Sequence, residues 1–250
     1  MGWRNSVPAV SSVITCFGET HIGLKRKRNE DSYICSPEQG LWLIADGMGG
    51  HAAGDIASSI VANQIAEAHA KGIPIAGTLS IARQSMADAV KVGQGAAGMG
   101  STVVVLVLIE DKYEITWVGD SRAYIWSEKS LVQITRDHTF VQTLVDQGVI
   151  TEEEAFFHPQ ANVLERAMGP HVEEAVADRV SNCLSPGERL LLCSDGLSSH
   201  VPHNDIENVF VECMDDRTTI QKLINLALVY GGRDNITAIV VSNSLNVGSS

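Results

Sequence analysis

Acidic residues stand beside tight turns at five widely separated points of this 250-residue chain. Each follows or precedes a short apolar run that is typical of a β-strand. The acidic sites are Glu30-Asp31, Asp46-Gly47, Asp120, Asp195-Gly196 and Asp234-Asn235. A fold that brings such strand ends together gathers negative charges, which repel one another unless a cation lies between them. The pattern therefore predicts a fold that collects its strand ends around divalent metal held by oxygen ligands.

The other patterns predict strands and helices that do not alternate regularly. The strongest strand pattern is the run at 102–109, whose β-branched residues suit a strand buried on both faces. Further strands are expected at 12–18, 32–36, 41–45, 113–118, 122–126, 174–182, 188–194 and 236–241, and helices at 52–70, 78–92, 139–147, 151–156 and about 216–229. Runs of strands interrupted by helix pairs indicate mixed antiparallel sheets with helices on their outer faces.

Composition and charge disfavour several classes of protein. With 44% apolar and 19% charged residues, the chain has an ordinary globular composition and the size of one large domain or two small ones. It has no apolar run of about 18 residues and no N-terminal secretory pattern, so we expect neither a membrane span nor export. The formal net charge of −12 argues against nucleic-acid binding, which depends on Lys and Arg.

The five cysteines predict neither disulfides nor a zinc site. None are spaced as CxxC, and their number is odd. Cys16, Cys35 and Cys193 lie in apolar segments that are typical of strands. We therefore expect buried free thiols in a reducing cytoplasm.

The basic segment before the first acidic pair allows three interpretations. Residues 23–31 form a solvated basic turn, a nucleic-acid patch, or an arginine placed beside two carboxylates. The acidic balance of the rest of the chain disfavours the second. In the third, the arginine holds a phosphate through two parallel hydrogen bonds, while the carboxylates hold a metal that contacts the same phosphate.

Two glycine-rich segments also have ordinary structural explanations. The turn at Gly47-Met48-Gly49-Gly50 either ends a strand and starts a helix, or lets the Gly47 carbonyl join Asp46 as a metal ligand. His51 is more typical of a helix start or a surface histidine, since the other candidate ligands are hard oxygens. Residues 93–98 match GxGxxG but precede a strand instead of following one, so we interpret them as a flexible turn.

Six motifs, taken together, carry a resemblance to a known family. In chain order they are Gly23-x-x-Arg26-x-x-Asn29-Glu30-Asp31, Asp46-Gly47-Met48-Gly49-Gly50, Gly100-Ser101-Thr102, Gly119-Asp120-Ser121-Arg122, Ser194-Asp195-Gly196 and Asp234-Asn235-Ile236-Thr237. In this combination the chain resembles the metal-dependent Ser/Thr protein phosphatases of type 2C, the PPM family, in their compact bacterial form. The resemblance covers about residues 12–242, nearly the whole chain.

The resemblance implies an α+β fold, a four-layer α-β-β-α sandwich in which two antiparallel sheets are flanked by helix pairs. It also implies a single phosphatase domain over residues 1–250, with a flap at about 138–170 near the active site. His138, His158 and Asn162 lie in that flap. We expect them to make structural hydrogen bonds, because metal-bound water carries the hydrolytic chemistry.

By the same resemblance, two Mn²⁺ or Mg²⁺ ions would lie at one end of the sandwich. Asp46 would bridge the two ions, and the Gly47 carbonyl would bind one of them. Asp195 and Asp234 would ligate the second ion.

The remaining site residues would surround this pair of ions. Glu30 and Asp31 would contact the metals directly or through their waters, and Arg26 would hold the substrate phosphate. Asp120 resembles the family's ligand for a third, weaker ion. The predicted catalytic residues are Arg26, Asp46 and Asp195.

Two positions depart from the family's pattern. Eukaryotic members carry a histidine two residues after the bridging Asp, where it is thought to protonate the leaving group. Here that residue is Met48, which leaves the general acid unassigned. Many relatives carry an Asp four residues after the Asp195 position to help bind the third ion. Here that residue is Ser199, and because a hydroxyl is a poor substitute for a carboxylate, we expect a weak third site.

These features predict a protein serine/threonine phosphatase that hydrolyses phosphoserine and phosphothreonine with water activated at a dinuclear centre. Its partners would be phosphorylated proteins, a cognate bacterial Ser/Thr kinase and that kinase's substrates, and we expect a cytoplasmic monomer. One alternative is a non-catalytic binding module on the same fold, which the complete set of ligand residues disfavours. Another is a different metal hydrolase such as a nuclease, which the acidic balance disfavours.

Overall fold

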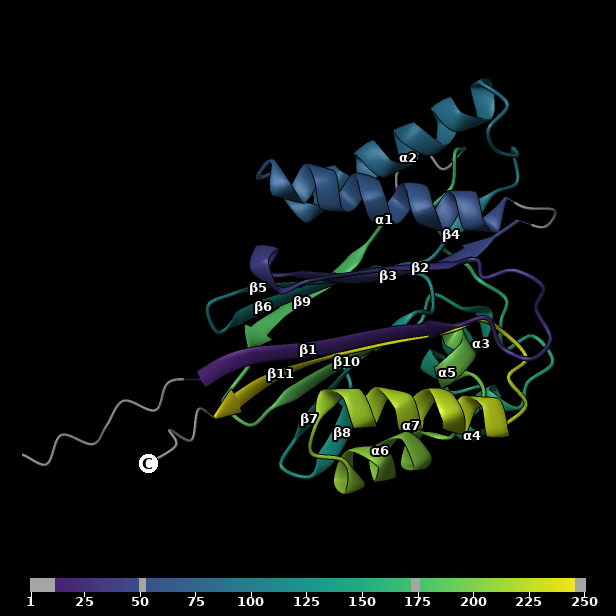
Figure 1. The fold of residues 1–250 in the computed structure, drawn as a ribbon. Helices are drawn as coiled ribbons and strands as arrows, with labels where there is room; N and C mark the ends of the chain where they lie inside the picture. Colours follow the sequence, from purple (N-terminus) through teal and green to yellow (C-terminus); the bar gives the residue numbers. More distant parts are fainter. Residues whose placement is uncertain (1–11, 50–52, 172–175, 246–250) are drawn as a thin grey trace, which may run out of the picture.

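Two antiparallel sheets stacked face to face form the centre of the molecule (Figure 1). The computed structural model describes residues 12–49, 53–171 and 176–245, so His51 lies outside the described residues. The strands are β1 (Ser12–His21), β2 (Asp31–Ser36), β3 (Leu41–Met48), β4 (Gly100–Ser101), β5 (Val103–Ile109), β6 (Lys112–Val118), β7 (Arg122–Ser127), β8 (Ser130–Gln133), β9 (Asp178–Cys183), β10 (Arg189–Cys193) and β11 (Ile236–Leu245). One sheet has the order β1-β11-β10-β7-β8, and the other has the order β2-β3-β5-β6-β9 with β4 paired to β3.

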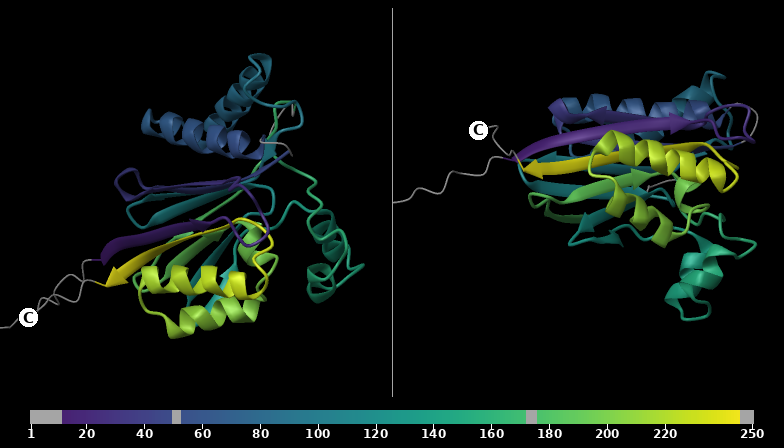
Figure 2. Two further views of the ribbon diagram at one scale, coloured as in Figure 1. Left: turned by 45° about the vertical axis from the view of Figure 1, so that its right-hand side comes forward. Right: turned by 60° about the horizontal axis from the view of Figure 1, so that its bottom comes forward.

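Helices cover the outer face of each sheet. They are α1 (Gly54–Ala70), α2 (Ile75–Lys91), α3 (Phe140–Asp146), α4 (Glu152–Phe156), α5 (Asp195–Ser198), α6 (His203–Glu212) and α7 (Asp216–Val229), with a 3-10 turn η1 (Pro37–Gln39). The pair α1 and α2 lies over the sheet of β3, and the pair α6 and α7 lies over the sheet of β11, which confirms the predicted α+β sandwich of four layers. Helices α3 and α4, in the segment predicted to be a flap, project from the sandwich (Figure 2). In the ranges that the structure describes, no helix combines the length and apolar character needed to span a membrane.

The central strands are apolar on both faces because each sheet packs on helices on one side and on the other sheet on its second side. In β5, Val103 joins the core beneath α1 and α2, whereas Val104 joins the core between the sheets. In β10, Leu191 packs with α6 and α7, and Leu190 packs between the sheets. The run at 102–109 is therefore buried on both faces over most of its length, as its composition predicts.

Some elements differ from the prediction. β11 continues to Leu245, past the predicted end at 241, because its whole length pairs with β1. α2 starts at Ile75, before the predicted start at 78. The short strand β8 and the helix α6 were not predicted. In α6 the buried residues Ile206, Val209 and Phe210 have helical spacing, but they make only one such repeat in a helix of ten residues, which is a short signal.

Candidate metal centre

Four of the predicted acidic residues lie at one common edge of the two sheets. In the sheet of β3, Asp31 and Asp46 face each other directly across β2 and β3. In the sheet of β11, Asp195 follows β10 and Asp234 precedes β11, and these two strands are antiparallel neighbours. The topology therefore gathers carboxylates that are far apart in sequence, as the strand-end pattern predicts.

Asp31 connects the two sheets through its side chain. Its Oδ2 accepts hydrogen bonds from Ser194 Oγ (2.8 Å) and Thr237 Oγ1 (2.6 Å), which belong to the opposite sheet and the turn after β10. The carboxylate is buried, and its Oδ1 has no hydrogen-bond partner among the described residues. Burial raises the pKa of Asp31 to about 7, and the charges of Asp195 and Asp234 contribute to this shift. We refer to this contact between the sheets, at Asp31, Ser194 and Thr237, as the seam.

Burial, and then neighbouring charges, raise the pKa values of the carboxylates beside the seam. Burial raises the pKa of Asp46 well above its usual range. Further contributions come from the charges of Asp31, Asp195, Asp120 and Asp234. The pKa of Asp195 is also raised, first by burial and then by Asp234. Asp195 Oδ1 is buried without a hydrogen-bond partner in the described part of the chain. All of these acids therefore lie within electrostatic reach of one another.

The donor set fits a hard divalent cation, because carboxylate and carbonyl oxygens are the preferred ligands of Mg²⁺ and Mn²⁺. A Cβ placed at Gly54 would lie 2.9 Å from both Glu30 Oε2 and the Gly47 carbonyl oxygen, so these two predicted ligands converge at the start of α1. Among residues 12–49, 53–171 and 176–245, no three Asp, Glu, His or Cys side chains surround one ion-sized point. The backbone thus brings these oxygens to one region without placing three such side chains around a single point.

Asn235 fixes the loop that carries the basic segment. Its Oδ1 accepts a hydrogen bond from Glu30 N (2.8 Å), and its Nδ2 donates to the carbonyls of Ile22 and Arg28 (2.9 Å each). Gly23, in the same loop, has a φ of +80°, and a Cβ there would lie 2.1 Å from a backbone carbonyl, so only glycine fits. The sequence places Asn235 in a motif but does not reveal this role, because its partners come from the other end of the chain.

Arg26 reaches the acidic cluster from this loop. Its Nη2 donates to Asp234 Oδ2 at 2.5 Å, and this hydrogen bond raises the pKa of Arg26. The Arg26 side chain is 49% exposed, so a ligand arriving from solvent can reach the guanidinium. The structure therefore places Arg26 beside the predicted ligands, paired with one of them.

The turn that carries Asp120 is attached to the backbone of Asp46. Thr102 N donates to the Asp46 carbonyl at 2.8 Å, and Thr102 Oγ1 lies 2.7 Å from Ser121 Oγ. Asp120 itself is buried, and its pKa is raised well above the usual range, first by burial and then by the charge of Asp195. The fifth acidic site of the sequence thus joins the other four.

His138 supports the same turn from the flap side. The ring Nδ1 of His138 accepts a hydrogen bond from Gly119 N (3.1 Å), and the backbone N–H of His138 donates to the Gly119 carbonyl (3.0 Å). Burial lowers the pKa of His138, which favours the neutral ring that this acceptor role requires. His158 likewise accepts from Gln160 N at 3.1 Å. These bonds agree with the structural roles expected for both histidines.

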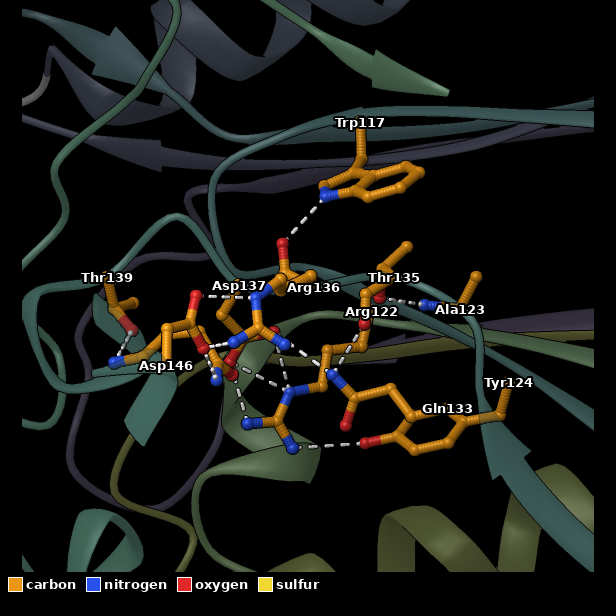
Figure 3. A network of polar contacts seen from close by, with 11 residues as sticks. Trp117, Arg122, Ala123, Tyr124, Gln133, Thr135, Arg136, Asp137, Thr139 and Asp146 are labelled. Atoms are coloured by element: carbon orange, nitrogen blue, oxygen red, sulfur yellow. Dashed lines mark hydrogen bonds and ion pairs between the residues drawn. The ribbon is translucent and has the colours of Figure 1, made fainter. Parts of the chain in front are cut away.

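An ion pair between the buried Asp137 and the partly exposed Arg122 holds the base of the flap (Figure 3). Arg122 donates to Asp137 from Nε (3.0 Å) and from Nη2 (2.7 Å). Nearby, Trp117 Nε1 donates to the Arg136 carbonyl at 2.8 Å. These contacts, which we call the flap base, tie the chain before α3 to β6 and β7. Because Arg122 follows Asp120 by two residues, the flap base and the Asp120 turn form one unit.

Two hollows lie beside the acidic cluster. Asp120 and Ser199 both line a cavity of about 830 Å³ between the flap helices and α6. Ser199, which is expected to make the third metal site weak, therefore lines the same cavity as Asp120. Met48 lines a second hollow of about 500 Å³, together with Arg166 and Met168.

Comparisons with known proteins identify the family. The family described as "Protein phosphatase 2C" matches residues 17–224. The serine/threonine protein phosphatase PstP of Mycobacterium tuberculosis is 37% identical over 238 residues, a match that covers 92% of this chain and 45% of PstP, so this chain spans less than half of that relative. The serine/threonine phosphatase stp of Listeria monocytogenes is 33% identical over 242 residues, with 90% of this chain and 94% of the relative covered.

A solved structure supports the same family. It is the catalytic domain of PstP in complex with two manganese ions, which is 35% identical with a TM-score of 0.80. The match covers 94% of this chain and 100% of that one. The sequence match over most of the chain and the shared fold lead to one conclusion: this chain belongs to the protein phosphatase 2C family.

Proposed function

We propose that this chain is a metal-dependent protein phosphatase that hydrolyses phosphoserine and phosphothreonine. The observation that carries the proposal is the group of acids at and beside the seam. Carboxylates from both sheets lie together there, and two buried carboxylate oxygens lack partners among the described residues. Membership of the protein phosphatase 2C family supports the reaction class. The two manganese ions of the PstP structure support a dinuclear site.

The proposed ligands of two Mn²⁺ or Mg²⁺ ions are oxygens that the fold already gathers. Asp46, the Gly47 carbonyl, Glu30, Asp31, Asp195 and Asp234 would hold the ions. When bound, the ions supply an activated water and offset the charge of the phosphate. Asp120, with Ser199 in the same cavity, is the proposed ligand of a third and weaker ion.

Arg26 is proposed to bind the substrate phosphate. A guanidinium matches two phosphate oxygens with parallel hydrogen bonds, and the exposure of Arg26 allows such a ligand to approach. Arg26 now donates a hydrogen bond to the Asp234 carboxylate. To bind a phosphate, the guanidinium would give up this bond, and Asp234 would then be available as a metal ligand. Asn235 keeps the Arg26 loop in place during this exchange. Met48 has no ionisable group, so it does not protonate the leaving serine.

The finer biological setting is part of the same proposal. We propose phosphorylated Ser/Thr proteins as substrates, a cognate kinase as partner, a monomeric state and a cytoplasmic location. The five free cysteines support a reducing compartment, and the net charge of −12 supports the lack of nucleic-acid partners.

Hydrolysis of p-nitrophenyl phosphate with Mn²⁺, before and after EDTA, tests the proposal. We expect the protein to hydrolyse this monoester and EDTA to abolish the activity. The variant Asp46→Asn should be inactive, whereas Asp88→Asn should keep its activity. Asp88 is the matched control because it is an exposed acid on α2, paired only with neighbours on that helix. Phosphate release from a phosphoserine peptide should follow the same pattern. Turnover of bis-p-nitrophenyl phosphate without monoester turnover would indicate a nuclease-like enzyme, and no turnover at all would favour a binding module.

A further inference from the structure

The thiols of Cys16 and Cys35 lie in contact, although 19 positions separate them in sequence. Their Sγ atoms are 3.2 Å apart. Cys16 lies in the middle of β1, and Cys35 lies near the end of β2, so the contact crosses from one sheet to the other. Both side chains are half-buried and pack against the apolar core between the sheets.

The two strands that carry these cysteines lie at open edges. β1 is the end strand of its sheet and β2 is the end strand of the other, and the two strands contact each other. The thiol pair is therefore closer to solvent than a pair in the central strands would be, and a small oxidant can reach it. Cys193 and Cys213, in contrast, are buried, and Cys183 is exposed with no thiol contact in the described part of the chain.

We propose that Cys16 and Cys35 form a reversible disulfide when the protein meets a hydroperoxide, and that this bond joins the edge strands of the two sheets. The sulfurs have to approach to about 2.05 Å, a movement of roughly 1 Å that paired thiols on adjacent edge strands allow. The disulfide closes a ring of chain from residue 16 to residue 35. That ring contains Arg26, Glu30 and Asp31. The bond therefore restrains the segment that connects β1 to β2, at a distance from these three residues.

The chemistry balances in two steps. The sulfur of Cys16 attacks one peroxide oxygen, the O–O bond breaks, an alcohol or water leaves, and Cys16 becomes a sulfenic acid. The sulfur of Cys35 then attacks the Cys16 sulfur, the S–O bond breaks, and the hydroxide leaves as water with the Cys35 proton. Two electrons pass from the thiols to the peroxide. Burial and the neighbouring thiol raise the pKa of Cys35 to about 12. The same disulfide forms if the two thiols exchange roles, because their sulfurs already lie in contact.

Disulfide formation has no geometric conflict with the metal centre. Cys35 lies four residues beyond Asp31 in β2, which is about 13 Å along a strand. The seam joins the two sheets at one end of β2, and the proposed bond joins them toward the other end. The oxidised protein should therefore keep its fold and resist unfolding more strongly than the reduced protein.

Peptide mapping of the full chain after treatment with hydrogen peroxide tests the proposal. Residues 25–28 are all Lys or Arg and all exposed, so trypsin separates the two cysteines into different peptides. A disulfide then appears as residues 5–25 linked to residues 29–71 without reductant. We expect this linked pair in the wild type and in the control Cys183→Ser, and its loss in Cys16→Ser, in Cys35→Ser and after reduction.

Thermal unfolding supplies the second measurement, which does not depend on phosphatase activity. We expect the oxidised wild type to melt about 5–10 °C above the reduced protein, and Cys16→Ser to show no such difference. The proposal is overturned if both cysteines stay unlinked at a peroxide dose that oxidises the exposed Cys183. It is also overturned if the linked protein melts at the temperature of the reduced protein or below it. Cys16→Ala replaces Cys16→Ser if the serine variant does not fold.

Discussion

The seam and the flap base hold buried acids in opposite ways. At the seam, Asp31 accepts hydrogen bonds only from the neutral hydroxyls of Ser194 and Thr237, and one of its oxygens lacks a partner among the described residues. At the flap base, Asp137 faces the guanidinium of Arg122 through both of its oxygens. The flap base is therefore complete as a structural contact, whereas the seam has excess negative charge that a bound cation would offset. The comparison separates acids that are placed to bind from acids that hold the fold.

The largest effect is expected when a predicted ligand is removed beside the seam. Asp195→Asn keeps the size of the side chain but removes its charge, so Mn²⁺-dependent hydrolysis of p-nitrophenyl phosphate should fall by about 100- to 1,000-fold. In the metal-free protein the same change should raise the melting temperature, because it removes repulsion from Asp234. Initial rates with Mn²⁺ measure the loss of activity, and thermal melts in EDTA measure the gain in melting temperature. A lower melting temperature in EDTA would contradict the excess of negative charge.

The raised pKa of Asp31 predicts how the stability of the metal-free protein depends on pH. The pKa is about 7 in the folded state and about 3.9 in an unfolded chain. Because the folded state holds the proton more tightly, this contribution is fully present below pH 4 and is lost as the pH rises to 7. The free energy of unfolding should therefore fall by about 2–4 kcal/mol over that interval.

Urea unfolding in EDTA between pH 5 and pH 8 measures this slope. Asp31→Asn should make this slope shallower, because the amide does not titrate, and the remaining slope comes from the other acids whose pKa values are raised. Saturating Mn²⁺ should also reduce it, because the cation favours the charged carboxylates. If the free energy of unfolding of the metal-free wild type rose from pH 5 to pH 8, ionisation of Asp31 would not destabilise the folded state.

A smaller effect is expected from the residue that positions the seam's loop. Asn235→Ala removes the hydrogen bonds to Glu30, Ile22 and Arg28, so Mn²⁺ affinity should weaken by about 10- to 100-fold. Asn243→Ala is the matched control, because Asn243 is an equally buried amide that donates to the Leu184 carbonyl at the other end of β11. Both variants should lose stability, but only the first should need more Mn²⁺ for half-maximal activity. If both variants needed the same Mn²⁺ concentration for half-maximal activity, Asn235 would have a structural role only.

The sequence predicts the acids at and beside the seam because each one stands next to its own strand. Asp31 begins β2, Asp46 lies in β3 and Asp195 follows β10, so local hydrophobic patterns place them without knowledge of the tertiary structure. The supports are different in kind. Gly54 matters because a side chain there would meet Glu30, and His138 matters because it bonds to Gly119. Such contacts between distant segments leave no periodic signal in the sequence.

The same distinction explains what the sequence predicts of the fold. The apolar run at 102–109 predicts a strand because both of its faces are buried, and the fold class follows from several such runs. Helix α6 was missed because a helix at the surface with few buried positions resembles a polar loop. The ion pair of Arg122 and Asp137 was also missed, since the sequence alone does not say which charges lie near each other.

The flap base should respond to substitution with a loss of stability and a smaller change in activity. Asp137→Asn leaves the partly exposed guanidinium of Arg122 without its carboxylate, so the free energy of unfolding should fall by about 1–3 kcal/mol. Asp146→Asn is the control, because Asp146 pairs with Arg136 on the surface, where an ion pair contributes less than about 1 kcal/mol. Urea unfolding and kcat measure the two effects. If Asp137→Asn lowered kcat as much as Asp195→Asn without loss of stability, the separation of the two regions would fail.

The smallest effect is expected where the flap base meets the acidic cluster. Asp120 and Ser199 line the same cavity, so Ser199→Asp adds a second carboxylate to that space. The added charge should tighten a third Mn²⁺ by about 10-fold, because ligand charge sets affinity for hard cations. Calorimetric titration should detect this change in Ser199→Asp and lose it in the double variant with Asp120→Asn. An isotherm equal to that of the wild type would mean that the two positions do not share an ion, and that Asp120 belongs with the residues that hold the fold.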